Sequence, residues 1–234
     1  MIAPIKFSNF AAAKFWQDNG ITEVYSKSWL DFVGYIINSD FRKSVKVKDW
    51  LSELVKYPSK ELQDIADLIP TNPFPDIQVK EIQNWIYKNI KYKIDKDIWQ
   101  MSEHWNTPDE TLKSMQGDCE DGAILMYTLC RLKGISSDRL LLMAGNVLLN
   151  NFASTGGHCW LAYRPFNYPL NFIFLDWCYY SDLKPIHEVC EMQLYNVIGK
   201  SIQSQNKTSY LYIWFAFNEI YSFYNLNDKF GGTK

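Results

Sequence analysis

Hydrophobic residues in the first part of the chain recur at intervals of three and four, which is typical of amphipathic helices. Three of these stretches follow a serine, a residue that often caps the first turn of a helix: Ser8, Ser28 and Ser59. A dense proline cluster then runs from Pro70 to Pro75 and interrupts the helical pattern. We therefore predict an N-terminal helical region over residues 1–70 and a second domain over residues 76–234.

Two further helices are predicted at the start of the second domain. Asp76 is a suitable N-cap for the first, whose hydrophobic stripe consists of Val79, Ile82, Ile86 and Ile90. Asp118 is a suitable N-cap for the second, which ends at Gly134, where a left-handed C-terminal cap belongs. Gly122 lies inside this second helix, at a position where alanine would be more stable by about 1 kcal/mol. We therefore expect another backbone segment to pass close to Gly122.

After Gly134 the pattern changes to short aromatic and aliphatic runs bounded by turn residues, as is typical of strands. In order along the chain, the runs are RLLLMAG, HCWLAYR, NFIFLDW, YLYIWFAF and IYSFY. The last two are separated by Asn218 and Glu219 and are predicted to form the final hairpin of a sheet. Helices followed by an antiparallel sheet predict an α+β fold.

The charge balance argues against nucleic acid as a partner. The 234 residues carry 24 Lys and Arg against 26 Asp and Glu, whereas nucleic-acid binding normally shows as clustered basic residues. No stretch approaches the roughly 18 apolar residues that span a bilayer, so no membrane partner is expected. The start of the chain lacks the basic segment of a signal peptide, which predicts a cytoplasmic protein with reduced thiols.

The cysteine pattern excludes the common structural uses of this residue. The chain has an odd number of cysteines and no CxxC pair: Cys119, Cys130, Cys159, Cys178 and Cys190. Neither a disulfide framework nor a four-thiolate zinc site fits this count and spacing. Cys178, His187 and Cys190 match no standard zinc set either. We expect four of the five to be packing residues and Cys119 to be the working thiol.

Cys119 stands at the start of the helix that Asp118 is predicted to cap. In the first helical turn, the unpaired backbone N–H groups and the helix dipole favour an anion and lower the pKa of a thiol. Glu120 and Asp121 are negatively charged neighbours that oppose this effect. A thiolate at this position therefore requires a cationic partner.

His158 is predicted to be that partner, oriented by Asp176. The runs HCWLAYR and NFIFLDW can form a hairpin, and pairing Arg164 with Leu170 places His158 directly opposite Asp176. A register slip of two residues leaves the two side chains diagonal to each other and still within reach. The same face carries residues that lower the local dielectric constant: Trp160, Ala162, Phe172 and Phe174. A thiol at a helix N-terminus, an imidazole and a carboxylate are the parts of an activated cysteine nucleophile.

The segments WIYKNIKYKID, EHWNTPDETL and GDCEDGAIL, followed by GGHCWLAY and LDW, carry a family resemblance. Residues 76–180 resemble the transglutaminase-like superfamily, and particularly its bacterial transglutaminase-like cysteine peptidases. The resemblance implies a papain/transglutaminase-like core in which the nucleophile helix packs on an antiparallel sheet. It also implies that Cys119 is the nucleophile, His158 the general base and acid, and Asp176 the orienting carboxylate.

The resemblance implies acyl transfer without fixing the reaction. Members of the superfamily include peptidases, protein-crosslinking transglutaminases and deamidases, and active ones pass through a thioester. We expect a peptidase that acts on a protein or peptide substrate. Besides the backbone N–H of Cys119, the side chains of Trp105 and Gln116 are candidate donors to the oxyanion.

Calcium is the only cofactor that the resemblance suggests, because some peptidases of this type bind it near the nucleophile. The candidates to hold it are Asp118, Glu120 and Asp121. Calcium takes six to eight oxygen ligands, so three carboxyl groups are too few unless others converge. We therefore expect no cofactor.

A protein of another class would also fit the sequence. A binding or structural module that keeps this fold, such as a component of a phage particle, would need no active thiol. The N-terminal helical region, residues 1–70, would then be the part that joins a larger assembly.

Overall fold

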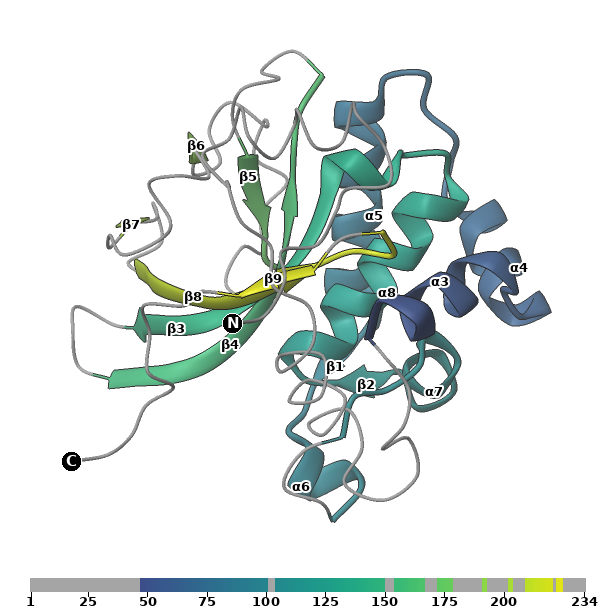
Figure 1. The fold of residues 1–234 in the computed structure, drawn as a ribbon. Coiled ribbons are helices and arrows are strands. Elements are labelled where there is room, and N and C mark those ends of the chain that lie inside the picture. Colours follow the sequence, from purple (N-terminus) through teal and green to yellow (C-terminus); the bar gives the residue numbers. More distant parts are fainter. Residues whose placement is uncertain are drawn as a thin grey trace.

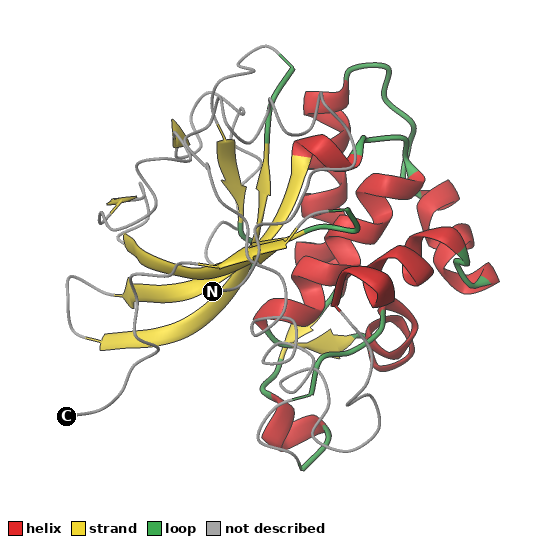
Figure 2. Ribbon diagram, viewed as in Figure 1, coloured by secondary structure: helices red, strands yellow, loops and turns green. Residues whose placement is uncertain are grey.

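A layer of helices and a curved antiparallel sheet lie side by side in the protein (Figure 1). The computed structural model describes residues 47–100, 104–149, 154–166, 172–178, 191–192, 202–203, 209–220 and 222–224. The helices predicted after Ser8 and Ser28 lie outside these residues, as do His187 and Cys190. Where the chain is described, the predicted α+β class is confirmed (Figure 2).

The helices precede the large sheet in the sequence. They are α3 (Val47–Lys56), α4 (Lys60–Leu68), α5 (Pro75–Asn89), α6 (Asp95–Ile98), α7 (Pro108–Ser114) and α8 (Cys119–Leu132). Two short strands among them, β1 (Lys91–Tyr92) and β2 (Gln116–Gly117), form a parallel pair. None of the described helices has the length and hydrophobicity needed to cross a membrane.

The large sheet is antiparallel. Its strands are β3 (Leu140–Leu149), β4 (Ser154–Tyr163), β5 (Phe172–Leu175), β6 (Glu191–Met192), β7 (Ile202–Gln203), β8 (Ser209–Phe217) and β9 (Ser222–Tyr224). The strand order is β6-β5-β4-β3-β8-β7, and β9 pairs with β8 on the side of this path. The pairing of β8 with β9 confirms the predicted final hairpin.

The start of α5 differs from the prediction. Asp76 does not cap this helix, because Phe74 is the N-cap residue and Pro75 takes the first helical position. The Asp76 carboxylate instead accepts hydrogen bonds from the Tyr163 hydroxyl at 2.6 Å and from the Phe166 backbone N–H at 2.8 Å. A proline is already set for the first helical turn, so the helix can begin without a side-chain cap. Asp76 thereby ties α5 to the end of β4.

Helix α8 is the centre of the helical layer. Its residues from Glu120 to Cys130 are buried, and it packs against α3, α4, α5, α7, β3 and β4. Gly134 follows the helix with a φ of +82°, the left-handed conformation predicted for its C-terminal cap. The backbone N–H groups of Gly134 and Ile135 donate to the carbonyls of Arg131 and Cys130, which satisfies the end of the helix.

The described part of the predicted N-terminal region shares its core with the rest of the chain. Ser59 caps α4 as predicted, since its hydroxyl accepts from the backbone N–H of Leu62 at 3.0 Å. Leu51 of α3 and Leu62 and Ala66 of α4 belong to the same hydrophobic core as α8 and the buried stripe of α5. The hydrophobic core therefore continues across residues 70–76. The division of the chain into two domains at this position stays a prediction.

Alternate residues of β4 have different surroundings. Cys159, Leu161 and Tyr163 belong to the hydrophobic core that also contains α8. His158 directly precedes Cys159, and Trp160 lies between Cys159 and Leu161. The side chains of His158 and Trp160 therefore leave the strand on its other face. Along β4, the residues that pack in the core with α8 therefore alternate with His158 and the Trp160 ring that stacks on it.

Candidate active site

A buried hydrogen bond joins His158 of β4 to Asp176, which directly follows β5. The distance between His158 Nε2 and Asp176 Oδ2 is 2.6 Å, and the two residues are 5% and 0% exposed. The Trp160 ring stacks on His158 at a centroid distance of 5.9 Å, and Phe174 meets Trp160 edge-on at 5.3 Å. The aromatic surroundings predicted for the pair are present at these positions, and their low dielectric strengthens the hydrogen bond.

The strand register differs by two residues from the predicted one. Leu161 pairs with Leu175, and Ala162 pairs with Phe174. In the predicted register, the partners of Leu161 and Ala162 would each be two residues earlier in the chain. Asp176 therefore lies diagonal to His158 and not directly opposite. A shift of two keeps every side chain on the same face of the sheet, so the hydrogen bond forms in spite of the error.

Cys119 begins α8, as predicted, and Asp118 is its N-cap residue. The side chain of Cys119 is half-buried, and its carbonyl accepts a hydrogen bond from the Trp177 indole N–H at 3.2 Å. Trp177 also packs over Gly122, where an added Cβ would lie less than 3.0 Å from the indole ring. The expectation at Gly122 was wrong, because the glycine makes room for a tryptophan side chain and not for a backbone segment.

The surroundings of the Cys119 thiol favour its neutral form. Sγ donates a hydrogen bond to Glu120 Oε2 at 3.0 Å. Burial raises the pKa of Cys119 well above its ordinary value, and the charges of Glu120 and Asp118 raise it further. Desolvation and negative neighbours therefore outweigh the effect predicted from the helix start.

The imidazole of His158 acts electrostatically on the turn that carries the thiol. Burial raises the pKa of Asp118, a hydrogen bond with Glu120 opposes this shift, and the nearby His158 lowers the pKa as well. His158 is thus within electrostatic range of the residue that precedes Cys119.

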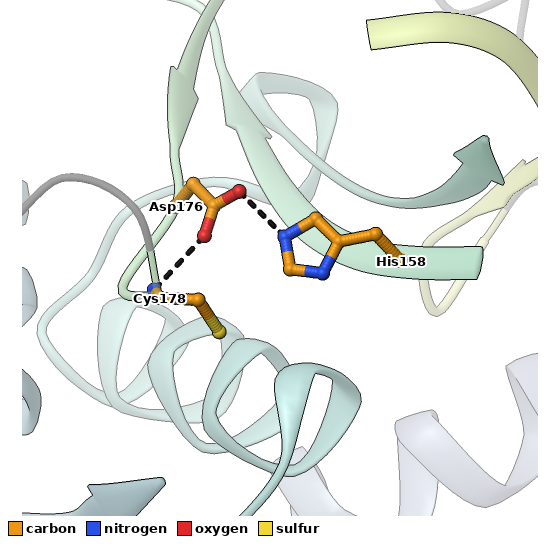
Figure 3. Close-up of side chains that lie close together, drawn as sticks. All are labelled: His158, Asp176 and Cys178. Carbon is orange, nitrogen blue, oxygen red and sulfur yellow. Dashed lines mark hydrogen bonds and ion pairs between the residues drawn. The ribbon is translucent and has the colours of Figure 1, made fainter. Parts of the chain in front are cut away.

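Cys178 lies beside the pair formed by His158 and Asp176 (Figure 3). Its backbone N–H donates to Asp176 Oδ1 at 2.9 Å, so both oxygens of this carboxylate are hydrogen-bonded. One ligand atom of each of these three side chains lies within 4.8 Å of the other two. Burial, followed by the charge of Asp176, raises the pKa of Cys178 well above its ordinary value.

Three carboxyl groups converge beside the nucleophile turn: Asp95, Asp118 and Asp121 have oxygens within 4.8 Å of one another. Asp121 Oδ1 accepts from the Asn106 backbone N–H at 2.8 Å, and Oδ2 accepts from the Asn106 side-chain amide at 2.7 Å. Burial, followed by the charge of Asp118, raises the pKa of Asp121 well above its usual range. Glu120 belongs instead to a group with Asp118 and Cys119.

Calcium fits this cluster by ligand type, because carboxylate oxygens are the ligands that it prefers. Glu120 was predicted as the third carboxyl group of this cluster, and Asp95 stands there in its place. Three carboxylates still supply fewer than the six to eight oxygens that calcium takes, unless they bind in bidentate fashion or water completes the site.

The two candidate oxyanion donors lie in different surroundings. Trp105 is 3% exposed, belongs to the hydrophobic core and stacks on Phe217 at a centroid distance of 6.1 Å. Gln116 is half-buried on β2, where it pairs with Lys91 of β1 and stands three positions before Cys119. Their role as oxyanion donors stays a prediction.

Comparisons with known proteins were made for the sequence and for the fold. Residues 63–165 match the family model of the transglutaminase-like superfamily. The match makes this part of the chain, somewhat less than half of the 234 residues, similar to that superfamily. The structure of LapG from Legionella pneumophila aligns with this transglutaminase-like fold at a TM-score of 0.49 and 17% identity, over 76% of this chain and 87% of that chain.

Two further structures complete these comparisons. Calcium-bound LapG from the same organism gives a TM-score of 0.47 at 17% identity, over 76% of this chain and 87% of that chain. A candidate cysteine protease from Cytophaga hutchinsonii gives 0.37 at 20% identity, over 58% of this chain and 44% of that chain. Curated protein sequences give no significant match.

Three residues of this candidate site were not predicted from the sequence. Cys178 was missed because the predicted register placed Asp176 opposite His158, whereas the observed pairing, continued to His158, brings residue 178 opposite it. Asp95 and Asn106 reach the turn from α6 and from the loop before α7. A helix of 4 residues and a loop are too short to show a hydrophobic period, so the sequence carries no signal for these two residues.

Proposed function

We propose that this transglutaminase-like protein is a cysteine-dependent enzyme that acts on protein amide bonds, and that it is a peptidase. The observation that carries the proposal is the buried hydrogen bond between His158 and Asp176, close to the turn that presents Cys119. An imidazole held by a carboxylate is the arrangement that orients a general base beside a cysteine nucleophile.

In the proposed reaction, His158 removes the thiol proton while Sγ of Cys119 attacks the amide carbonyl. Asp176 accepts the Nε2–H of His158, which assigns Nδ1 as the basic nitrogen. When the tetrahedral intermediate collapses, the C–N bond breaks and His158 returns the proton to the leaving amine. Water then attacks the thioester with His158 again as base, which releases the carboxylic acid and restores the thiol.

The environment of Cys119 supports activation during the attack and not before it. The thiol donates to Glu120, and its raised pKa keeps it protonated at neutral pH. Proton removal by His158 is therefore coupled to the attack on substrate. In this respect the proposal departs from the preformed ion pair that the sequence suggested.

The oxyanion requires donors at the start of α8. The backbone N–H of Cys119 is the first, because Cys119 takes the first helical position, where an N–H has no partner within the helix. We favour Gln116 as the second, since it stands on the strand that leads to the nucleophile, while Trp105 is packed in the core. We expect Gln116→Ala to lower kcat by about 10²–10³ with little change in KM, and the matched variant Gln116→Glu to restore none of it.

Calcium bound between Asp95, Asp118 and Asp121 would place positive charge beside Cys119 and favour its thiolate. The residues themselves act without it: Asp121 holds the loop at Asn106, and Asp118 begins the helix. The proposed reaction uses no metal in any step.

Alkylation by iodoacetamide across pH, with the modified peptides mapped by mass spectrometry, tests the nucleophile. We expect Cys119 to react in a manner that depends on His158, so that His158→Ala slows its alkylation by at least about tenfold near neutral pH. The Cys119→Ser variant identifies the label. If Cys119 reacts like a model thiol and His158→Ala changes nothing, the proposed activation is wrong.

A mixed protein substrate incubated with a labelled primary amine distinguishes the reactions of the superfamily. A peptidase cleaves chains and leaves the amine free. Amine incorporation without cleavage would replace the peptidase proposal with a transglutaminase. Ammonia release without either product would replace it with a deamidase.

One observation favours a second candidate function. The thiol of Cys119 donates a hydrogen bond to Glu120, and burial together with the charge of Glu120 raises the pKa of the thiol. A thiol held in its neutral form is expected in a site that carries out no chemistry. A binding module of this fold would show no turnover on any amide or ester, and its folding and partner binding would be unchanged by Cys119→Ser.

A further inference from the structure

Three side chains of different ligand type meet where β5 ends beside the middle of β4. His158 comes from β4, and Asp176 and Cys178 come from the turn after β5 (Figure 3). One ligand atom of each lies within 4.8 Å of the others. His158 is 5% exposed and Asp176 is fully buried, while Cys178 is half-buried. The cluster is therefore preorganised by the sheet, and Cys178 is its least buried member.

The donor set is an imidazole nitrogen, a carboxylate oxygen and a sulfur. Zinc takes these ligands at about 2.0–2.3 Å, which puts the ligand atoms of a tetrahedral site about 3.3–3.8 Å apart. Side chains already within 4.8 Å need only small shifts to reach that geometry. A thiolate ligand disfavours calcium and magnesium, which select oxygen, and favours a borderline-soft ion such as zinc.

We propose that His158, Asp176 and Cys178 form a zinc-binding site that switches the active site off. Binding forms a Zn–S bond at Cys178, breaks its S–H bond and releases that proton to the solvent. The ion also takes up a His158 nitrogen and an Asp176 oxygen, with water in the fourth position. An imidazole bound to zinc cannot accept the proton of Cys119. The inhibitory part therefore rests on the proposed function, whereas the binding itself does not.

Cobalt(II) is a direct probe of the binding, because a thiolate bound to Co²⁺ gives a sulfur-to-metal charge-transfer absorption that oxygen and nitrogen ligands do not give. The full chain is treated with a chelator, desalted and titrated with Co²⁺. We expect this band to saturate with one ion per chain and to disappear when Zn²⁺ is added. Absence of the band in the wild-type protein overturns the proposal.

Two matched variants identify the sulfur, because Asp118, Cys119 and Glu120 form a competing group. Cys178→Ser should abolish the band and weaken Zn²⁺ binding by at least about tenfold, and Cys119→Ser should leave both unchanged. The reverse pattern would place the metal at Cys119 and refute the proposed site. If Cys178→Ser does not fold, His158→Gln, which keeps both thiols, must weaken Zn²⁺ binding to the same extent.

Inhibition is measured separately as the turnover of the wild-type protein in stoichiometric Zn²⁺. We expect loss of turnover that the chelator reverses and that Cys178→Ser resists. If the protein has no turnover at all, the proposed function fails while the Co²⁺ titration still decides the site. If turnover is present and Zn²⁺ inhibits both proteins equally, the switch is wrong.

Discussion

Gly122→Ala is the substitution for which helix propensity and packing predict opposite results. On an isolated helix, the change from glycine to alanine is stabilising by about 1 kcal/mol. In this protein, the new Cβ would meet the indole ring of Trp177, whose Cδ1 would lie at 2.8 Å and two further ring atoms still closer. Ordinary contact begins at 3.4 Å, so the ring would have to retreat by more than 0.6 Å, the difference between 3.4 and 2.8.

The indole of Trp177 has little room to retreat. It is 3% exposed, and its N–H donates to the Cys119 carbonyl at 3.2 Å. Overpacking of this kind is destabilising by about 1–3 kcal/mol, and loss of the hydrogen bond adds about 1 kcal/mol. After the helix gain of about 1 kcal/mol is subtracted, Gly122→Ala should lower the free energy of unfolding by about 1–3 kcal/mol.

Urea unfolding followed by circular dichroism measures this difference. In a chain of this size, each kcal/mol lowers Tm by about 2–4 °C, so a thermal scan also resolves it. Gly156→Ala is the matched control, because an added Cβ there meets no atom within 4 Å. In the double variant with Trp177→Phe, whose smaller ring relieves the overlap, the penalty should shrink. Equal or greater stability of Gly122→Ala relative to wild type would refute the packing argument.

Three further predictions follow from the charges in and near the site. Glu120→Gln removes the largest charge effect on Cys119, so its thiol pKa should fall and its alkylation by iodoacetamide should become faster at neutral pH. Burial lowers the pKa of Lys80 from 10.5 to about 8, so this residue binds more protons in the unfolded chain between these pH values, and its contribution to stability should rise by about 3 kcal/mol across that window. The difference in the free energy of unfolding between wild type and Lys80→Met, measured in urea at pH 7.5, 9 and 10, should therefore shift towards wild type by about this amount. About millimolar Ca²⁺ should raise Tm by offsetting the repulsion among the clustered carboxyl groups, and Asp95→Asn should remove the increase.

Local signals in the sequence were sufficient for most of the helical layer. Ser59 and Asp118 mark helix starts, and Gly134 marks a helix end, because each of these residues satisfies backbone groups within its own turn. The same rule predicted wrongly that Asp76 caps α5. Pro75 already starts that helix, and the Asp76 carboxylate accepts a hydrogen bond from the Tyr163 hydroxyl instead. The cap was wrong because a distant strand supplied a competing donor, and no local pattern reveals such a donor.

The candidate site was predictable where it depends on side-chain alternation. His158 and Asp176 meet in the predicted way although the register was wrong by two, since a strand repeats its facing every second residue. The protonation state of Cys119 could not be predicted, because the rotamer of Glu120 decides whether the carboxylate turns away or bonds the thiol. The sequence shows that a charged residue follows Cys119, but it does not show where the carboxylate of that residue points.

Asp176 is held by more than the sheet. Its backbone carbonyl accepts from the Gln83 side chain of α5 at 3.4 Å, and the Gln83 carbonyl oxygen accepts from the Lys80 ammonium at 2.7 Å. Its carboxylate accepts from His158 and from the backbone N–H of Cys178. The orienting carboxylate is therefore fixed by the helical layer and by the sheet together.

The same short turn also holds the nucleophile. Trp177 follows Asp176 directly and bonds the carbonyl of Cys119, so one peptide segment positions both the partner of His158 and the start of α8. A displacement of this segment must change the position of the thiol and of the imidazole at once. An alanine at position 122 would place its Cβ against the Trp177 side chain of this segment. The substitution should therefore slow the His158-dependent alkylation of Cys119 even in chains that remain folded, and a loss of stability with unchanged alkylation would show that the turn does not couple the two.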